Sequence, residues 1–349
     1  MNNILLKYIG VFLVFMSMIW HSVPLHAQIT PDLFPEDLST EGDLTRTFCQ
    51  PGVLGKSRSK GLEVVYGNRG SGYYNGENFE LTDRPSNYRR WESLKISLKV
   101  PIIIKDELKI LIGYKYYGEY FNFDRIGNDF STVINGLNTS PLKSNNFSVI
   151  VSRSLDERRY LAVRFRYGLN GNYKGFLKND QRYAAYNLLG IYGIKPNENF
   201  EWGVGLTFSK NFRRFIVLPL VVVNKNFNEK WGMELVLPGL AYMRYNASEK
   251  DILLGGLEFN SKNFRLDIAE PSLPNLDYAY NQSHILSSIR YQRQLFPWVW
   301  ASIQAGYLFN FSTRFEAKNS NTTAFELTPS NDLFFKIGIF ISPESSTKK

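Results

Sequence analysis

The sequence predicts an all-β fold, a single antiparallel, up-and-down transmembrane β-barrel. Three observations lead to this fold class. Apolar residues alternate with polar ones along several segments, and the connections between these segments alternate in length. In addition, no apolar run after the first 20 residues approaches the roughly 20 residues of a membrane-spanning helix. The length of 349 residues would allow two domains, but β-barrels of this size often form one unit.

Residues 1–27 are expected to be a cleaved signal peptide. Lys7 is their only charged residue, an apolar stretch runs from Tyr8 to Trp20, and Ala27 ends a plausible cleavage site. The apolar stretch of 13 residues is too short to cross about 30 Å of hydrocarbon as a helix. An uncleaved N-terminal anchor is the alternative. A signal peptide implies export, and the cell outer membrane is the expected location.

The mature chain divides into three parts by composition. Residues 28–60 contain several Pro, Gly and Ser with little periodicity, which predicts an irregular periplasmic leader or a short plug. Residues 61–342 are expected to form the barrel, and residues 343–349 a polar C-terminal tail. Cys49 is the only cysteine, so the chain has no disulfide framework and the thiol has no obvious role.

The alternation that predicts strands is clearest in residues 200–209, where every second residue is apolar and the others are small, polar or charged. The segments 93–100, 160–167 and 333–341 show the same pattern. Residues 215–223 are apolar at nearly every position and therefore depart from it. No internal repeat of fixed period is visible, which argues against a propeller or a solenoid.

Connections of two lengths separate these segments. Short polar turns are expected at 105–107, 156–158, 196–199, 246–250 and 294–297, and longer Gly-, Asn- and Ser-rich loops at 67–91, 122–144, 170–182, 269–283 and 312–331. Such alternation is typical of outer-membrane barrels, with short periplasmic turns and long outer loops. Because closure favours an even number, we expect about twelve strands, with ten to fourteen allowed. The region 231–268 is ambiguous, since Pro238 and Gly239 could form a turn or a kink.

A barrel in lipid is favoured over a secreted sandwich, the alternative all-β fold, by strand length and by aromatic residues. Strands of about 10–12 residues approach the ~9–11 needed to cross a bilayer at a tilt. Aromatic side chains gather near expected strand ends, as in the girdles of membrane barrels. These residues are Tyr114, Tyr116, Tyr117, Tyr120, Trp298 and Trp300.

The face opposite the apolar one carries too many charges for a dry core, because unpaired buried charges cost several kcal/mol each. Its bases are Lys95, Lys99, Lys109, Lys115, Arg164, Arg166, Arg265, Arg290 and Lys336, and its acids are Glu119, Glu201, Glu234, Glu258 and Asp267. A hydrated lumen removes that cost. The residues expected to line it are Lys95, Lys99, Lys109, Lys115, Arg164, Arg166, Glu201, His284 and Arg290. They either select anions or pair with the acids and fill the interior.

Two segments carry a resemblance to a known type of protein. One is Trp231–Pro238, with the sequence WGMELVLP, and the other ends in Met243–Asn246, with the sequence MRYN. With the Ala-Gln cleavage end, these segments resemble uncharacterised porin-like outer-membrane β-barrels of the Gram-negative envelope. The resemblance implies no assigned activity, and it implies outer-membrane lipid and the barrel-assembly machinery as partners. The chain departs from the pattern after Phe340, because a polar tail replaces the usual terminal aromatic residue.

No motif predicts chemistry. The glycines of residues 67–72 resemble a phosphate loop, but no helix N-terminus follows to bind an anion. After removal of the signal, His284 is the one remaining imidazole, and the residue two positions later is Leu286 rather than the serine of barrel lipid hydrolases. An envelope lipid hydrolase is therefore the least favoured function. No catalytic residue, cofactor or metal site is expected.

The expected function is a narrow passive or weakly selective pore for small solutes, anionic ones included. The alternative is a structural or interaction barrel whose outer loops, such as 122–144, bind a partner or a glycan. Two pairs of arginines, Arg89 with Arg90 and Arg213 with Arg214, could contact the phosphates of lipopolysaccharide. Nucleic acid is not expected as a partner, because the bases point into the barrel rather than outward from one face.

Overall fold

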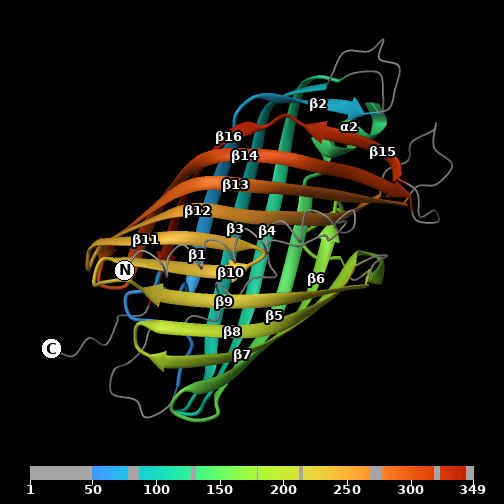
Figure 1. The fold of residues 1–349 in the computed structure, drawn as a ribbon. Coiled ribbons are helices and arrows are strands. Elements are labelled where there is room, and N and C mark those ends of the chain that lie inside the picture. The colour runs from blue at the N-terminus through green and yellow to red at the C-terminus, as the bar shows by residue number, and fades with distance from the viewer. Residues whose placement is uncertain are drawn as a thin grey trace, which may run out of the picture.

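Figure 1 shows a computed structural model of the chain, which describes residues 49–77, 86–126, 131–178, 180–211, 215–267, 277–317 and 323–342. The expected signal peptide, the leader up to residue 48, Arg213, Arg214 and the expected tail 343–349 lie outside these ranges. No helix among the described residues is long and apolar enough to cross a membrane.

The described chain is almost entirely β-structure. The strands in the first half are β1 (Leu62–Arg69), β2 (Gly72–Glu77), β3 (Ser86–Ile104), β4 (Leu108–Arg125), β5 (Leu142–Ser154), β6 (Arg159–Gly171), β7 (Ala184–Asn197) and β8 (Phe200–Lys210). Those in the second half are β9 (Phe215–Asn226), β10 (Trp231–Leu237), β11 (Leu240–Ser248), β12 (Asp251–Asp267), β13 (Asp277–Phe296), β14 (Val299–Ala317), β15 (Thr323–Pro329) and β16 (Asp332–Ile341). Two short helices join them, α2 (Ser131–Thr139) and the 3₁₀ turn η3 (Gln181–Tyr183).

Neighbouring strands pair antiparallel around a closed barrel (Figure 1). Closure occurs because β1 pairs with β3 on one side and with β16 on the other. Beyond β1 and β16, β2 and β15 pair with each other and continue the wall. With β2 counted as a continuation of β1, and β15 of β16, fourteen strands close the barrel among the described residues. The all-β barrel is confirmed, but the expected count of twelve is wrong, although it lies within the allowed range.

Most short turns gather at one end of the barrel, here called the turn end, and longer connections at the other, the loop end; the short turn at Pro238 and Gly239 between β10 and β11 points toward the loop end. The five expected short turns are confirmed, and the chain makes a sixth between β9 and β10. Several expected loops are largely structured instead. Residues 122–144 contain the end of β4, the helix α2 and the start of β5, and Arg89 and Arg90 lie within β3.

The predicted alternation is present along the barrel wall. In β8, Trp202, Val204 and Leu206 are 37–48% exposed, whereas Glu201 and Thr207 are 1% exposed. The same division in β3, β6 and β16 creates an apolar belt around the outside. This is the opposite of a soluble sandwich, in which the apolar face would be buried.

Two large apolar clusters of buried residues lie in the described part of the barrel, beside two smaller ones. The turn-end core includes Ile150, Leu189, Leu220, Leu254 and Trp300, and the apolar β9 run contributes its inward residues to it. The aromatic cap at the loop end combines the α2 side chains of Val133, Ile134 and Leu137 with rings from β2, β3, β4, β12, β13 and β14. The interior is therefore apolar at both ends and polar between them.

The aromatic residues expected to form girdles divide between the two faces. Trp298 and Tyr120 are exposed, as a girdle requires. Trp300 instead faces inward and stacks on Phe340 with ring centroids 6.1 Å apart, and Tyr117 also faces inward. The expectation was wrong for these two. Tyr117 is an odd number of positions from Tyr120 and so points to the opposite face, and Trp298 precedes β14, so the alternation along that strand does not relate it to Trp300.

The barrel narrows at the loop end. Gly171 at the end of β6 pairs in parallel with Arg265 of β12. Asn172 then continues the contact, since its amide accepts from Asp267 N over 2.8 Å. Five strands, β7 to β11, lie between β6 and β12 in the sheet order. These five strands therefore belong to the wall only at the wider turn end.

An irregular segment, Cys49–Lys60, lies against the inside of the turn end and is here called the strap. Two buried carboxylates hold it. Glu201 Oε1 accepts from Gly52 N over 3.0 Å, and Glu234 Oε2 accepts from Ser57 Oγ over 2.6 Å. The Arg58 guanidinium lies 5.2 Å from the centroid of the Trp300 ring, so the strap also packs on the turn-end core.

Candidate solute chamber

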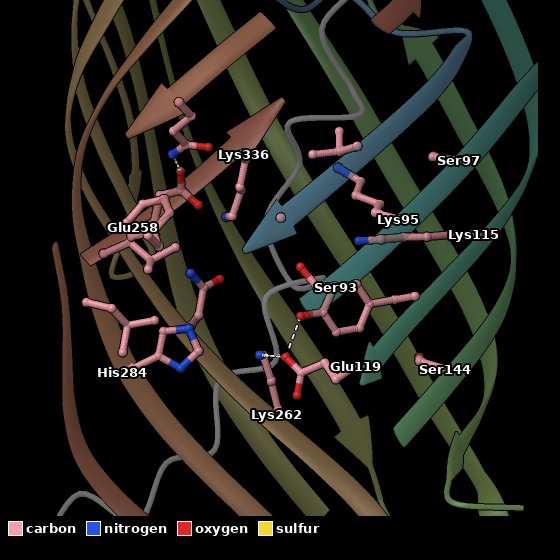
Figure 2. A pocket seen from close by; sticks show the side chains of 18 of the residues that line it. Ser93, Lys95, Ser97, Lys115, Glu119, Ser144, Glu258, Lys262, His284 and Lys336 are labelled. Atoms are coloured by element: carbon pink, nitrogen blue, oxygen red, sulfur yellow. Dashed lines mark hydrogen bonds and ion pairs between the residues drawn. The ribbon is translucent and has the colours of Figure 1, made fainter. Parts of the chain in front are cut away.

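A cavity of about 230 Å³ lies inside the barrel between the turn-end core and the aromatic cap. Eight basic and three acidic described residues line it, which gives the lining a formal charge of +5 with His284 neutral. The bases are Lys60, Arg69, Lys95, Lys115, Arg164, Lys262, Arg290 and Lys336, and the acids are Glu63, Glu119 and Glu258. We call this cavity the chamber. Figure 2 shows Lys95, Lys115, Lys262 and Lys336 reaching into it from different strands.

One wall of the chamber is organised around Glu119 of β4. Its Oε1 forms an ion pair with Lys262 of β12 and accepts from the Tyr117 hydroxyl over 2.5 Å (Figure 2). Lys262 Nζ also lies 5.4 Å from the centroid of the Tyr117 ring. Nearby, the Arg69 guanidinium lies 3.7 Å from the centroid of the Trp91 ring, within the range of a cation–π contact.

The opposite wall is organised around Glu258 of β12. Its Oε1 accepts from Arg290 Nη2 over 2.9 Å and from Gln304 Nε2 over 3.0 Å, and the Tyr242 hydroxyl also donates to it. A third acid, Glu63, pairs with Lys95 over 2.7 Å and with Lys60 of the strap over 2.6 Å. Each acid thus has at least one cationic partner, and the bases remain in excess.

Five of the nine residues that the sequence suggested for the lumen line the chamber: Lys95, Lys115, Arg164, His284 and Arg290. The other four do not. Lys99 and Lys109 lie further toward the turn end, and Arg166 donates to Asn187 Oδ1 over 3.3 Å. Glu201 is occupied by the strap and by the Tyr160 hydroxyl, 2.5 Å away.

The residues that the sequence suggested for the lumen do not include three of the chamber cations, Lys60, Arg69 and Lys262. Lys60 and Arg69 fall in segments interpreted as leader and loop. Lys262 falls in residues 260–263 of β12, which are polar on both faces, so the alternation is not visible there. Arg265, which was expected to face inward, instead donates from Nη1 to the Arg182 carbonyl over 3.0 Å and does not line the chamber.

His284 lines the chamber, but its neighbouring serines are engaged elsewhere. Ser283 Oγ donates to Ser261 Oγ over 3.2 Å, and Ser288 Oγ accepts from Gln304 Nε2 over 2.8 Å. Within the described part of the chain, no hydrogen bond joins His284 to either serine. The histidine–serine pair that a lipid hydrolase needs is therefore not assembled in this arrangement.

Comparison with known proteins adds a family. A family model described as "Domain of unknown function (DUF6268)" matches residues 71–342, which cover the barrel from β2 to β16. No curated protein matches the sequence.

Among solved structures, the chain is similar to the NanC porin, with 8% identity, 80% of this chain and 99% of that chain covered, and a TM-score of 0.35. It is similar to a FadL homologue of Pseudomonas aeruginosa, with 9% identity, 80% and 90% covered, and a TM-score of 0.41. It is also similar to the toluene transporter TodX of Pseudomonas putida, with 6% identity, 80% and 88% covered, and a TM-score of 0.32.

Proposed function

The chain belongs to the family described as "Domain of unknown function (DUF6268)", and from its geometry we propose that it is an outer-membrane channel or transporter for small anionic solutes. The observation that carries this proposal is the chamber, whose lining has a formal charge of +5. Rings of one charge in a narrow passage favour ions of the opposite sign.

The outer surface supports the membrane part of the proposal. The apolar belt includes Leu98, Phe165, Val204, Ile303 and Ile337, all of them 43–48% exposed. Soluble monomers rarely expose a contiguous apolar surface of this extent, whereas lipid solvates it. A closed barrel also pairs its backbone groups internally, as lipid requires.

Electrostatics supports the anionic part. At roughly 8 Å, one uncompensated charge attracts a monovalent anion by about 0.5 kcal/mol in bulk water and about 2 kcal/mol at an effective dielectric constant of 20. An excess of five positive charges therefore favours an anion over a cation by several kcal/mol, which is more than tenfold in occupancy. The ion pairs within the lining do not remove this excess.

The two apolar clusters define what transport requires. The strap and the turn-end core lie on one side of the chamber, and the aromatic cap with α2 on the other. A solute that crosses the barrel passes both, so side chains of these clusters move during transport. This predicts small, infrequent conductance steps rather than the steady current of an open porin.

The test is a measurement of ion selectivity in planar lipid bilayers, from the reversal potential across a tenfold gradient of KCl. We expect discrete steps with a preference for chloride. The double substitution Lys115→Gln and Lys336→Gln removes two charges from the chamber and should lower that preference severalfold. Lys225→Gln serves as the matched control, because Lys225 is an exposed lysine of β9 that does not line the chamber.

Two outcomes would overturn the proposal. One is a bilayer that stays silent at protein amounts that give clear steps for a known porin. The other is a preference for chloride that Lys225→Gln lowers as much as the double substitution does.

A further inference from the structure

Buried polar atoms of the chamber lining that have no hydrogen-bond partner among the described residues include Arg69 Nη1, Glu119 Oε2 and His284 Nδ1. Their side chains belong to residues that are 9%, 1% and 2% exposed. An unsatisfied buried polar group costs about 1–3 kcal/mol, so native proteins rarely retain one without a partner such as water or a ligand.

These atoms belong to side chains that neighbouring groups hold in place. The Arg69 guanidinium lies against the Trp91 ring, which fixes its plane. Glu119 uses only Oε1 for Lys262 and Tyr117, which leaves Oε2 without a donor. Figure 2 shows Glu119, Lys262 and His284 directed into the same part of the chamber. We call this set, Arg69, Glu119, Lys262 and His284, the acceptor corner.

The other carboxylate of the chamber behaves differently. Glu258 is surrounded by donors from Arg290, Gln304 and Tyr242, and none of its oxygens is a buried atom without a partner. An unsatisfied carboxylate oxygen is therefore a property of Glu119 and not of Glu258.

The chemistry of the corner restricts its ligand. Arg69 and Lys262 are cations and only donate, so they match a carboxylate. A carboxylate oxygen such as Glu119 Oε2 only accepts, so it needs a hydroxyl or an amine on the ligand. The cavity of about 230 Å³ is far larger than the ~10–15 Å³ that one water needs, so it has room for a small organic molecule.

We propose that the acceptor corner is a binding site for a small hydroxycarboxylate, with its carboxylate at Arg69 and Lys262 and its hydroxyl at Glu119 Oε2. This inference rests on the proposed function and refines it from anions in general to hydroxylated organic acids. The barrel then holds its solute at a saturable site during transport.

The experiment is calorimetric titration of the purified, folded barrel with three probes of similar size: malate, succinate and the neutral diamide malamide. We expect malate to bind most tightly and succinate, which lacks only the hydroxyl, at least tenfold more weakly, because it leaves Glu119 Oε2 unsatisfied. Malamide should not bind measurably, since it carries no charge.

Substitutions assign the two interactions separately. Glu119→Gln should reduce the ratio of the affinities for malate and succinate to near one. Arg69→Gln should weaken the binding of both acids by a similar factor of ten or more. Arg158→Gln, in an exposed turn, is the matched control and should change neither. The difference in gel mobility between unheated and boiled samples reports whether each variant folds. If Glu119→Gln does not fold, the comparison of malate with succinate on the unmodified chain still tests the role of the hydroxyl.

Equal affinities for malate and succinate would overturn the role of the hydroxyl, and the absence of binding by either acid would overturn the site. Both results can be told apart from failure of the proposed function, which is decided by chloride selectivity in bilayers. A barrel that is selective for chloride but binds neither acid would support the proposed channel function and contradict the proposed binding site.

Discussion

Gly171 pairs with Arg265 across an interval of five strands, and this contact narrows the barrel at the loop end. A side chain at position 171 has no room. A Cβ there would lie 2.5 Å from the Arg265 carbonyl oxygen and would also meet the Tyr183 ring. Because the first of these atoms is backbone, it cannot rotate away. The narrowing of the barrel therefore depends on a residue without a side chain.

We expect Gly171→Ala to destabilise the barrel by about 1–3 kcal/mol, the usual cost of overpacking. The measurement is urea unfolding followed by the loss of the fast-migrating, unheated band on a gel. Gly190→Ala is the control, because a Cβ at Gly190 of β7 would meet nothing within 4 Å. Equal unfolding midpoints for the two variants would contradict the role assigned to the contact.

The ion pair between Lys262 and Glu119 gives a second prediction. Both side chains are buried, at 7% and 1% exposure, so Lys262→Met leaves a buried carboxylate without its nearest cation. We expect a loss of about 3 kcal/mol in the free energy of unfolding. Arg293→Met, which breaks a pair that is 60% exposed at the arginine, should cost less than about 1 kcal/mol. A similar cost for both variants would show that the lumen screens the Lys262 pair as bulk water does.

These contacts show which parts of the barrel the sequence could predict. Alternation identifies the outward and inward faces correctly wherever the outer face is apolar and the inner face is polar, as in β8. It fails in residues 260–263 of β12, where both faces are polar. There, Ser261 and Asn263 alternate with Lys262 but are also buried, against Ser283 and Asn281. An outer face that is polar and covered has no signature in the hydrophobic pattern.

The strand count was misjudged for a related reason. Strands β10 and β11 have only 7 and 9 residues, and a turn at Pro238 and Gly239 joins them. This hairpin is shorter than a crossing strand is expected to be, so length could not distinguish it from one kinked strand. The hairpin can be short because β6 and β12 meet at the loop end and close the wall there. No local sequence pattern reveals this long-range pairing.

The strap provides a prediction about reactivity. Burial raises the pKa of the Cys49 thiol from 9.0 to about 11, so at pH 8 only about one molecule in 10³ carries the reactive thiolate. We expect alkylation by N-ethylmaleimide at pH 8 to be slow in the folded barrel and fast in urea, as measured by mass spectrometry.

Loosening the strap should increase this reactivity. Glu201→Gln weakens the acceptor of Gly52 N, and we expect it to raise the alkylation rate severalfold. The matched control is Glu198→Gln, because that side chain is 48% exposed and pairs with Lys195 rather than with the strap. If Cys49 reacts as rapidly in the unmodified folded barrel as in urea, the strap is not seated at the turn end.

The apolar belt gives the most direct test of where the barrel resides. Val204 is 48% exposed near the middle of β8. On a soluble protein, Val204→Lys would change stability by less than about 0.5 kcal/mol, as exposed substitutions usually do. In a bilayer, a lysine that faces lipid near the midplane costs about 2–4 kcal/mol.

We therefore expect Val204→Lys to lower the free energy of unfolding by at least about 2 kcal/mol when the barrel is folded into phospholipid vesicles. The control is Asn197→Lys, because Asn197 lies at the exposed turn end of β7, where a lysine should leave the free energy of unfolding nearly unchanged. The ratio of the two effects matters more than either value, because it separates lipid depth from a general effect of charge. If both substitutions cost the same small amount in vesicles, the belt does not face hydrocarbon.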